Sequence, residues 1–357
     1  MPPKKKDGKG KKGKAPEVSP EDIDAFLKAY KNMCRDAGLQ VYEPLLKQLT
    51  NDEDREEFMQ TQQLLLHPTD PQDPSEIRLG PGGARALCTA VLGIVPGMEK
   101  PFKAVKAIRC WQSKIGDDGT CSFAEVLRLG GAECPLQYLE LFDNNIGVRG
   151  CRALGVAIMV GGNKSLQTLR LDYNNDIGSE GVSNICRGLR SNCTLLQLHM
   201  PFCGIDAIGG KSLSDALAFR ALGLKLLNLE GNHIGDEGLA FLCPGLEANV
   251  SLVELNLADN GIGTNAHDLA PISMFAGVIS GHKTLTSLNL NFNRLCPQAA
   301  DALLPGLLDP LDPTKSHPRL QHVIVDAALQ NIPPETYAKL NVEGGGGKKG
   351  KKGKKKK

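Results

Sequence analysis

Apolar residues recur along the middle of the chain at spacings of three, two, three and two. The stretch LQYLELFDNNIG, residues 136–147, places leucine at Leu136, Leu139 and Leu141 and asparagine at Asn144. A helix needs spacings of three and four and a strand needs two, so the pattern predicts a short strand that ends in a turn. The register returns every 28 to 35 residues. Its first positions are Val105, Leu136, Leu166, Leu195, Leu224, Leu252, Leu285 and Leu320.

A second element follows each predicted strand. In the stretch GDEGLAFLCPGLEAN, residues 235–249, apolar residues lie three and four apart and an asparagine closes the run. This spacing is typical of an amphipathic helix with its stop signal. Each unit is therefore predicted to be a strand, a turn and a returning helix, and about eight such units indicate a repeat protein.

The repeat LxxLxLxxNxIGxxGxxxL resembles the leucine-rich repeats of the ribonuclease-inhibitor type over residues 101–331. The resemblance implies an α/β leucine-rich repeat solenoid, a right-handed horseshoe with a parallel inner sheet and outer helices. It says much about fold and little about function, because one fold serves many functions.

Residues 17–100 are predicted to form a helical region. Ser19 is a helix cap with Pro20 in the first turn, and residues 43–49 and 52–66 suggest two further helices. The stretch HPTDPQDPS is an irregular loop. LGPGGARAL, residues 79–87, matches the start of a repeat helix but follows no strand pattern. We therefore expect a half-repeat whose helix caps the open end of the solenoid.

The two ends of the chain are strongly basic. Residues 1–14 hold seven lysines and one aspartate, and residues 344–357 hold eight lysines, so a total net charge of +2 leaves −12 for the body. We expect a disordered basic arm at residues 1–16, and a short helix with a disordered Gly/Lys tail at residues 332–357. The N-terminus has no apolar segment for a signal peptide and no run is long enough to span a membrane, which favours a cytoplasmic protein.

The candidate chemistry is sparse. Eleven cysteines without a CxxC pair argue against a disulfide framework and a zinc site, and no nucleophile, base and acid stand in a catalytic pattern. We expect no enzyme activity, cofactor or metal. The sequons at Asn163, Asn192 and Asn249 fall between helix and strand, where asparagine tolerates the left-handed conformation, so we interpret them as structural. Asn144 and its equivalents in other units are predicted to be buried, bonding to the backbone of neighbouring turns.

The residues between the repeat leucines point away from the core, onto the concave surface. In the first units they include aromatic and charged side chains, which are enriched at binding hot spots, whereas the later units are small and polar. The candidate partner-binding residues are Arg109, Trp111, Tyr138, Glu140, Phe142, Arg170, Asp172 and His199. In the alternative interpretation, the aromatic residues pack under the N-terminal helices and the charged residues neutralise one another across strands.

The predicted function is a non-enzymatic scaffold with a protein partner on the concave face. Leucine-rich repeats flanked by MPPKKKDGKGKKGK and a Gly-Lys tail resemble the leucine-rich-repeat proteins of cilia and flagella, which implies a structural subunit of an axoneme or other cytoskeletal assembly. The arms then hold acidic tubulin tails by screened charge. Two alternatives are a small-GTPase regulator similar to the Ran GTPase-activating proteins and a nuclear scaffold whose arms bind RNA without sequence specificity.

Overall fold

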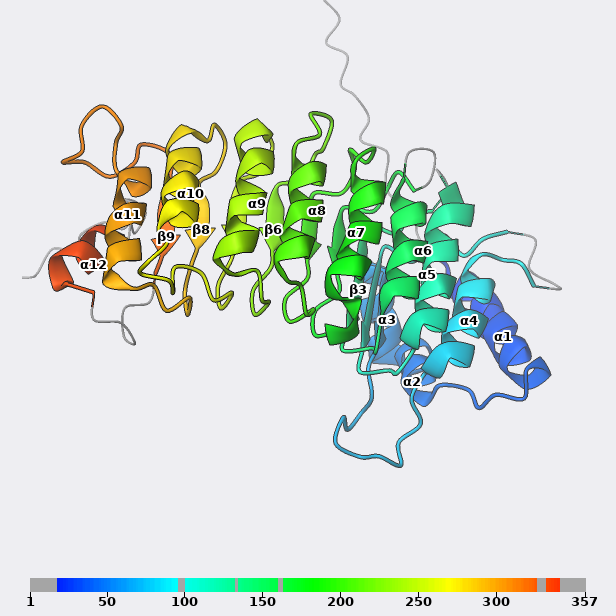
Figure 1. Cartoon of the computed structure of the whole chain (residues 1–357). Coiled ribbons are helices and arrows are strands. Elements are labelled where there is room, and N and C mark those ends of the chain that lie inside the picture. The colour runs from blue at the N-terminus through cyan, green and yellow to red at the C-terminus, as the bar shows by residue number, and fades with distance from the viewer. Residues whose placement is uncertain (1–17, 96–99, 132–133, 160–162, 326–331, 341–357) are drawn as a thin grey trace, which may run out of the picture.

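The computed structural model describes residues 18–95, 100–131, 134–159, 163–325 and 332–340. Helices and strands alternate along most of the chain (Figure 1). The strands are β1 (Gln63–Leu66), β2 (Ala107–Trp111), β3 (Tyr138–Phe142), β4 (Thr168–Arg170), β5 (Gln197–His199), β6 (Leu226–Asn228), β7 (Glu254–Asn256), β8 (Ser287–Asn289) and β9 (His322–Ile324). The helices are α1 (Pro20–Asp36), α2 (Glu43–Thr50), α3 (Asp52–Thr61), α4 (Gly80–Val91), α5 (Gly116–Gly130), α6 (Val148–Ile158), α7 (Gly178–Leu189), α8 (Ala207–Leu217), α9 (Gly235–Ala248), α10 (Ala270–Gly281), α11 (Pro297–Leu307) and α12 (Pro334–Leu340).

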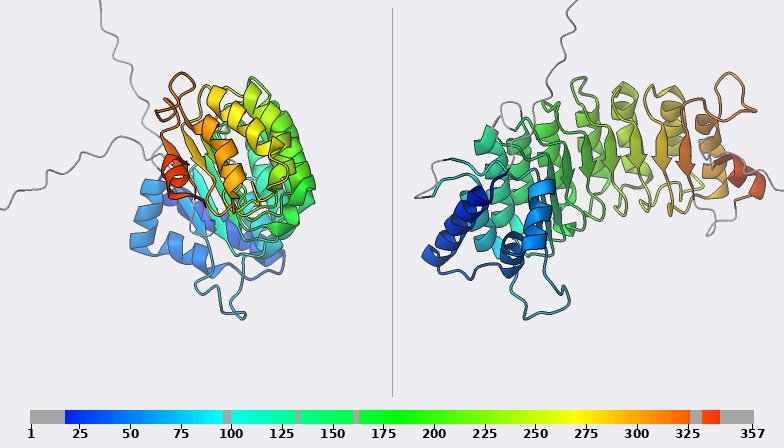
Figure 2. Two further views of the ribbon diagram at one scale, coloured as in Figure 1. Left: turned by 60° about the vertical axis from the view of Figure 1, so that its left-hand side comes forward. Right: turned by 180° about the vertical axis from the view of Figure 1, so that it is seen from behind.

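The strands form one parallel sheet in chain order, from β1 to β9. The helices α4 to α11 cover one face of this sheet, and the whole forms an arc with the strands on its inner side (Figures 1 and 2). The register stacks the central apolar position of each unit, so that Leu139 pairs with Ile108 on one side and Leu169 on the other. These side chains are buried, and each leucine so buried contributes about 2 kcal/mol. The predicted repeat and the α/β solenoid are confirmed.

A column of buried asparagines holds the turns after the strands together. The Asn174 side chain accepts hydrogen bonds from the backbone N–H groups of Asn144 and Ile146, at 2.9 and 3.1 Å. Its amide nitrogen donates to the carbonyls of Leu141 and Leu171, both at 2.8 Å. One side chain thus satisfies backbone groups of two neighbouring units, as predicted, and such groups are costly to bury unpaired.

A second buried column lies between each helix and the following strand. The Asn192 side chain accepts from the N–H groups of Thr194 and Leu195 and donates to the Ile158 carbonyl of the preceding unit. Asn163 and Asn249 make the same turn, and the Nδ1 atom of His282 or His317 replaces the amide oxygen in the last units. The sequon asparagines are therefore structural. The predicted left-handed backbone is wrong, since Asn249 is extended at φ −76° and ψ 138°, because its side chain makes the turn.

The solenoid begins one strand earlier than the sequence predicts. Residues 52–66 are not one helix, because Gln62 turns into the left-handed region at φ 56° and ends α3. The leucines that follow then form β1, which pairs with β2 from Gln63 to Leu66. The half-repeat before α4 is consequently a complete unit with a long loop, and the described part of the chain contributes nine strands to the sheet.

Three helices close the N-terminal end of the arc. The helix cap predicted at Ser19 is a capping box with Asp22 that begins α1, which packs against α4. From α2, the Gln48 side chain donates to the Gln63 carbonyl at 3.0 Å and accepts from the Leu65 N–H at 3.1 Å. A single amide thereby pairs with the open edge of β1 as a neighbouring strand would, and the edge is not left as a template for other chains.

The C-terminal end carries α12, which packs on α11. The basic arm at residues 1–16 and the tail beyond Leu340 lie outside the described residues. Within the described part of the chain, none of the helices combines the length and apolar character required for a membrane crossing.

Candidate protein-binding surface

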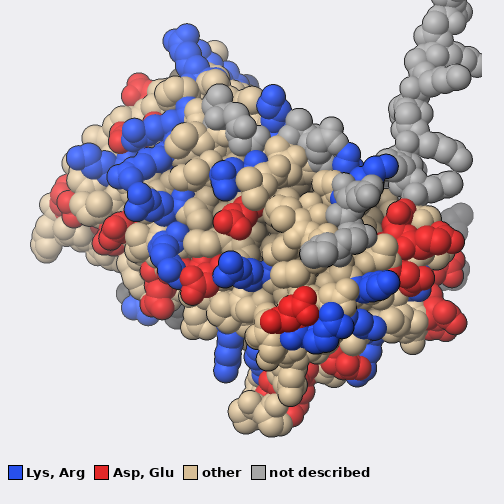
Figure 3. Space-filling model, turned by 90° about the vertical axis from the view of Figure 1, so that its right-hand side faces the viewer, with Lys and Arg blue, Asp and Glu red and all other residues tan. Residues whose placement is uncertain are grey.

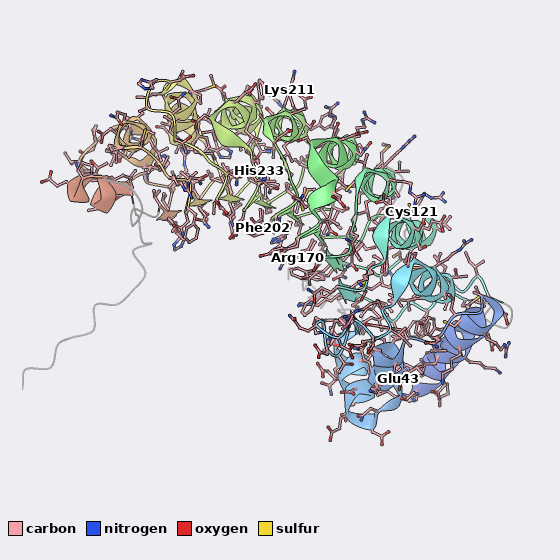
Figure 4. The ribbon with its side chains drawn as sticks, turned by 60° about the horizontal axis from the view of Figure 1, so that its bottom comes forward. Glu43, Cys121, Arg170, Phe202, Lys211 and His233 are labelled. Atoms are coloured by element: carbon pink, nitrogen blue, oxygen red, sulfur yellow. The ribbon has the colours of Figure 1, made fainter. Side chains whose placement is uncertain are left out.

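The predicted binding residues lie together on the inner face of the arc. Arg109, Glu140, Arg170 and His199 occupy one row across β2 to β5, because the parallel register aligns them. Figure 4 shows Arg170 and Phe202 on this inner side and Cys121 and Lys211 on the outer side. We call the inner side the concave face and the helical side the convex face.

Four charged residues of the concave face form one network. Glu140 lies between two guanidinium groups, 3.7 Å from Arg109 and 3.8 Å from Arg170, and it also accepts from the Tyr138 hydroxyl at 2.8 Å. Arg170 also pairs with Asp172 at 2.6 Å. The carboxylates are only 5% and 3% exposed, so the arginines and Tyr138 present the outer surface. The pairing across strands expected in the alternative interpretation is present.

The close packing of these charged groups shifts the pKa values of several side chains. Hydrogen bonding to Asp172 raises the pKa of Arg170, and burial together with the Glu140 hydrogen bond raises the pKa of Tyr138. Burial and the Arg170 charge lower the pKa of His199 to about 4, although Asp172 acts in the opposite direction. His199 is therefore neutral at pH 7, and its Nδ1 atom makes no hydrogen bond among the described residues.

A row of rings crosses the first five units beside this network. His67, Trp111, Phe142, Tyr173 and Phe202 follow one another with ring centroids 5.7, 6.4, 5.0 and 4.6 Å apart. We call these five residues the aromatic ladder. The rings flanking Trp111 and Phe142 come from the loop after β1 and the turn after β4, not from α1 to α3. Tyr173 is 49% exposed, and the others are partly exposed.

Three rings of the ladder were not predicted to be binding residues: His67, in the loop after β1, and the turn residues Tyr173 and Phe202. The two turn residues stand one position beyond the outward-facing strand residues, with φ of 61° and 53°. The Tyr173 N–H nevertheless donates to the Pro201 carbonyl and the Phe202 N–H to the Glu230 carbonyl, both at 2.9 Å. The pairing holds these turn residues at the spacing of neighbouring strands, close to 4.8 Å, which is also a stacking distance.

Gly231 marks the end of the ladder. A Cβ atom there would lie 2.2 Å from a ring carbon of Phe202, and the backbone has φ 67°. The ring of Phe202 therefore extends over the neighbouring unit only because that unit has no side chain at this position.

The concave face of the later units is built from small polar residues. The side chains of Asn228, Asn256 and Asn289 each accept from the N–H two residues ahead at 3.0 Å. Their amide oxygens are thus used within their own turns. Phe292 is 51% exposed at the position equivalent to Phe202, but no ring pair links it to another described residue.

The next question is whether the described residues include a metal-binding cluster or reactive thiols. They contain no group of three or more His, Cys, Asp or Glu that could hold a metal ion. The described cysteines are unpaired, and burial raises the pKa of Cys110, Cys186 and Cys203 to about 12. Thiols with so high a pKa are poor nucleophiles.

Comparisons with known proteins agree with this architecture. A family model described as a leucine rich repeat matches residues 133–155, 162–186, 191–214, 224–243, 248–265 and 281–304. The ribonuclease inhibitor of Mus musculus is 31% identical over 231 residues, which are 63% of this chain and 47% of that protein. NACHT, LRR and PYD domains-containing protein 5 of Homo sapiens is 32% identical over 206 residues, covering 57% of this chain and 16% of that protein.

The chain thus spans about half the length of the ribonuclease inhibitors it matches. A solved tropomodulin C-terminal domain from Caenorhabditis elegans aligns with a TM-score of 0.35 at 15% identity, covering 44% of this chain and 92% of that one. The family matches and the nine-stranded parallel sheet covered by helices show that the fold is an α/β leucine-rich repeat solenoid.

Proposed function

We propose that this protein is a non-enzymatic scaffold that binds a protein partner through the aromatic ladder and the charged network of its concave face. The observation that carries the proposal is the ladder, in which partly exposed rings follow one another across five neighbouring units, the first and last pairs stacked and the middle pairs edge-on or tilted. Rings are the side chains that most often dominate protein interfaces. Their neighbours already hold them in place, so binding orders few additional rotamers.

The charged network orients the partner on such an interface. Arg109 lies 5.0 Å from the centre of the Tyr138 ring, and Arg170 is held by two carboxylates. Fixed guanidinium groups beside rings favour a partner surface that combines apolar side chains with hydrogen-bond acceptors. The Mus musculus relative is named as an inhibitor of a ribonuclease, which supports a role in holding another protein.

We further propose that the scaffold belongs to a cytoskeletal assembly, the axoneme of a cilium or flagellum. The support is the combination of leucine-rich repeats with lysine-rich ends, at residues 1–16 and in the Gly/Lys tail of residues 332–357. In this proposal the arms hold acidic tubulin tails through charge that salt screens, while the concave face selects the partner.

The test compares two double variants of the tagged full-length protein in its native cell. Tyr173→Ala with Phe202→Ala removes two rings of the ladder, and Phe219→Ala with Phe292→Ala removes two exposed rings elsewhere. After cross-linking and high-salt extraction, we expect recovery of the partner to fall about tenfold in the ladder variant, a loss of about 1.4 kcal/mol, and to stay unchanged in the control.

Three outcomes would contradict parts of the proposal. Equal recovery with both variants would remove the aromatic ladder as the binding surface. A soluble nuclear location of the wild-type protein would remove the axonemal assignment. Stimulation of GTP hydrolysis by a small GTPase would favour the regulatory alternative.

A further inference from the structure

A groove on the convex face lies between two neighbouring outer helices, α5 and α6. Its volume is about 420 Å³. Glu125 and Arg128 line it from α5, and Arg149, Arg152, Ala153 and Val156 line it from α6. Figure 4 shows Cys121, another residue of α5, on the outer rim of the arc, far from Phe202 on the inner rim. The groove is therefore separate from the concave face.

The charge of this groove is not balanced. Among the described residues that line it, three guanidinium groups stand against the single carboxylate of Glu125. Arg149 pairs with Asp118 outside the groove, whereas Arg128 and Arg152 are exposed and form no ion pair with another described residue. Two arginines are thus available to an external anion.

The surroundings extend the positive charge toward the neighbouring helices. Arg85 on α4 and Arg187 on α7 are also exposed. Figure 3, viewed from the N-terminal end of the arc, shows Lys and Arg gathered over its upper left, where the outer helices lie. Electrostatic attraction from such a surface raises the association rate of an acidic partner.

The groove also has an apolar part. Val156 is 50% exposed, and Ala153 lies beside it on α6. The described residues that line the groove include no aromatic side chain, so the aromatic platform on which single-stranded nucleic acids usually stack is absent. These features favour an acidic protein segment over a nucleic acid.

We infer that the groove between α5 and α6 binds an acidic peptide segment of a partner protein. Glutamate or aspartate side chains of that segment pair with Arg128 and Arg152, because a guanidinium group matches a carboxylate with two parallel hydrogen bonds. An aliphatic side chain of the segment covers Val156. The inference does not depend on the function proposed for the concave face.

The experiment measures the affinity of the full-length protein for a fluorescein-labelled glutamate-rich peptide with leucine at every fourth position, by fluorescence anisotropy. The test variant is Arg128→Ala with Arg152→Ala. The matched control is Arg85→Ala with Arg187→Ala, which removes the same charge from exposed positions on the adjacent helices. Both variants keep the lysine arms, so any binding by the arms is common to both.

We expect the dissociation constant to rise about tenfold in the test variant and less than about twofold in the control, with the effect shrinking as salt is added. Val156→Asp, which places a carboxylate at an exposed position, should also weaken binding while thermal unfolding stays unchanged. The ladder variant with Tyr173→Ala and Phe202→Ala should bind the peptide normally.

Equal dissociation constants for the test and control variants would overturn the inference. A single-stranded oligonucleotide of equal charge provides the second decisive comparison. If the oligonucleotide binds as tightly as the peptide and loses the same factor in the test variant, the groove is a general polyanion site and its assignment to acidic peptides is wrong.

Discussion

The first half of the arc, β1 to β5 with α4 to α8, and the second half, β6 to β9 with α9 to α11, share a backbone and differ in the side chains they expose. The first half has the aromatic ladder and the charged network inside and the arginine-lined groove outside. The second half has asparagines inside, and the charged residues of its outer helices α9 to α11 are all acidic: Asp236, Glu237, Glu247 and Asp301.

This contrast distinguishes the buried positions, whose residues the fold requires, from the exposed positions, whose residues the fold does not determine. The buried leucines and the asparagine column recur in both halves, because every unit has the same backbone groups to satisfy. The exposed positions carry no such requirement. The concentration of rings and arginines in one half therefore supports the binding surfaces that we propose, and each experiment below tests a difference or an identity between the halves.

The largest effect should be common to both halves. Asn174→Ala removes two acceptor bonds and two donor bonds of a buried side chain. Asn293→Ala removes the same set in the second half. We expect each variant to lose about 4 kcal/mol of unfolding free energy, because buried N–H and carbonyl groups are left unpaired. Urea unfolding followed by circular dichroism measures the loss. A loss of unfolding free energy in only one of the two variants would show that the asparagine column does not have the same role in both halves.

The next effect should separate the halves. Glu140→Gln removes the charge that two arginines share in the first half, and we expect a loss of about 2 kcal/mol in unfolding free energy. Glu230→Gln is the matched change in the second half, where the carboxylate accepts from the Asn256 amide at 3.0 Å. That change should cost less than about 1 kcal/mol. The same urea titrations measure both losses of unfolding free energy. Equal losses for Glu140→Gln and Glu230→Gln would mean that the charged network adds no more stability than the single hydrogen bond of Glu230.

The boundary between the halves is tested at two glycines. Gly231→Ala places a methyl group against Phe202, whereas Gly261→Ala has nothing within 4 Å, and the two residues have similar φ of 67° and 70°. Both variants suffer the backbone strain of about 1 kcal/mol. The extra cost of Gly231→Ala, about 1 kcal/mol more, reports the contact with the ring.

Side-chain NMR of the aromatic ladder provides the second measurement for this pair. Gly231→Ala should shift the ring resonances of Phe202 and Tyr173, and Gly261→Ala should leave them in place. Unchanged resonances in the first variant would mean that Phe202 does not rest over Gly231.

The smallest effect concerns pH and the second half. Asn192 and Asn249 occupy a turn position at which His282 stands in a later unit. Burial lowers the pKa of His282 below its usual 6.5, so the folded state holds the neutral ring. Its contribution to stability is complete above pH 6.5 and is lost as the pH falls below that value, since the unfolded state binds the proton more tightly.

Protonation would also convert the Nδ1 acceptor of His282 into a donor, against the N–H groups of Thr284 and Leu285. We expect about 1 kcal/mol less stability at pH 5 than at pH 7, seen as lower amide-exchange protection factors in residues 282–290, each referred to the intrinsic exchange rate at that pH. His282→Asn should remove this part of the pH dependence. An unaltered profile in that variant would show that other groups cause it.

The sequence predicted most of what repeats. The leucine register placed β2 to β9, and the asparagine column followed from its fixed position. The sequence did not predict β1, because the three leucines at 64–66 continue the apolar spacing of the preceding helix. In the structure the backbone turns at Gln62, before these leucines, and the helix ends there. A local pattern contains no information about which strand edge will pair with it.

The candidate site was predicted in part. Trp111 and Phe142 were expected on the concave face because strand residues alternate sides. Tyr173 and Phe202 reach the same face through positive φ angles in the turn, which strand alternation does not describe. The equivalent turn positions in other units are Gln112, Asp143, Gly231, Asp259 and Phe292. An alignment of the turns of all units would therefore have identified Tyr173 and Phe202 as residues of one column. The groove between α5 and α6 depends on how two helices pack side by side, which no single repeat specifies.

The Gln48 amide limits how a chain of this kind could change its number of repeats. Units between β2 and β9 each present the same two edges, so duplication or deletion of one unit leaves every junction of the same type. A unit added before β1 would instead have to displace the amide that occupies its edge. Growth and shortening of the array are therefore confined to positions after the first strand.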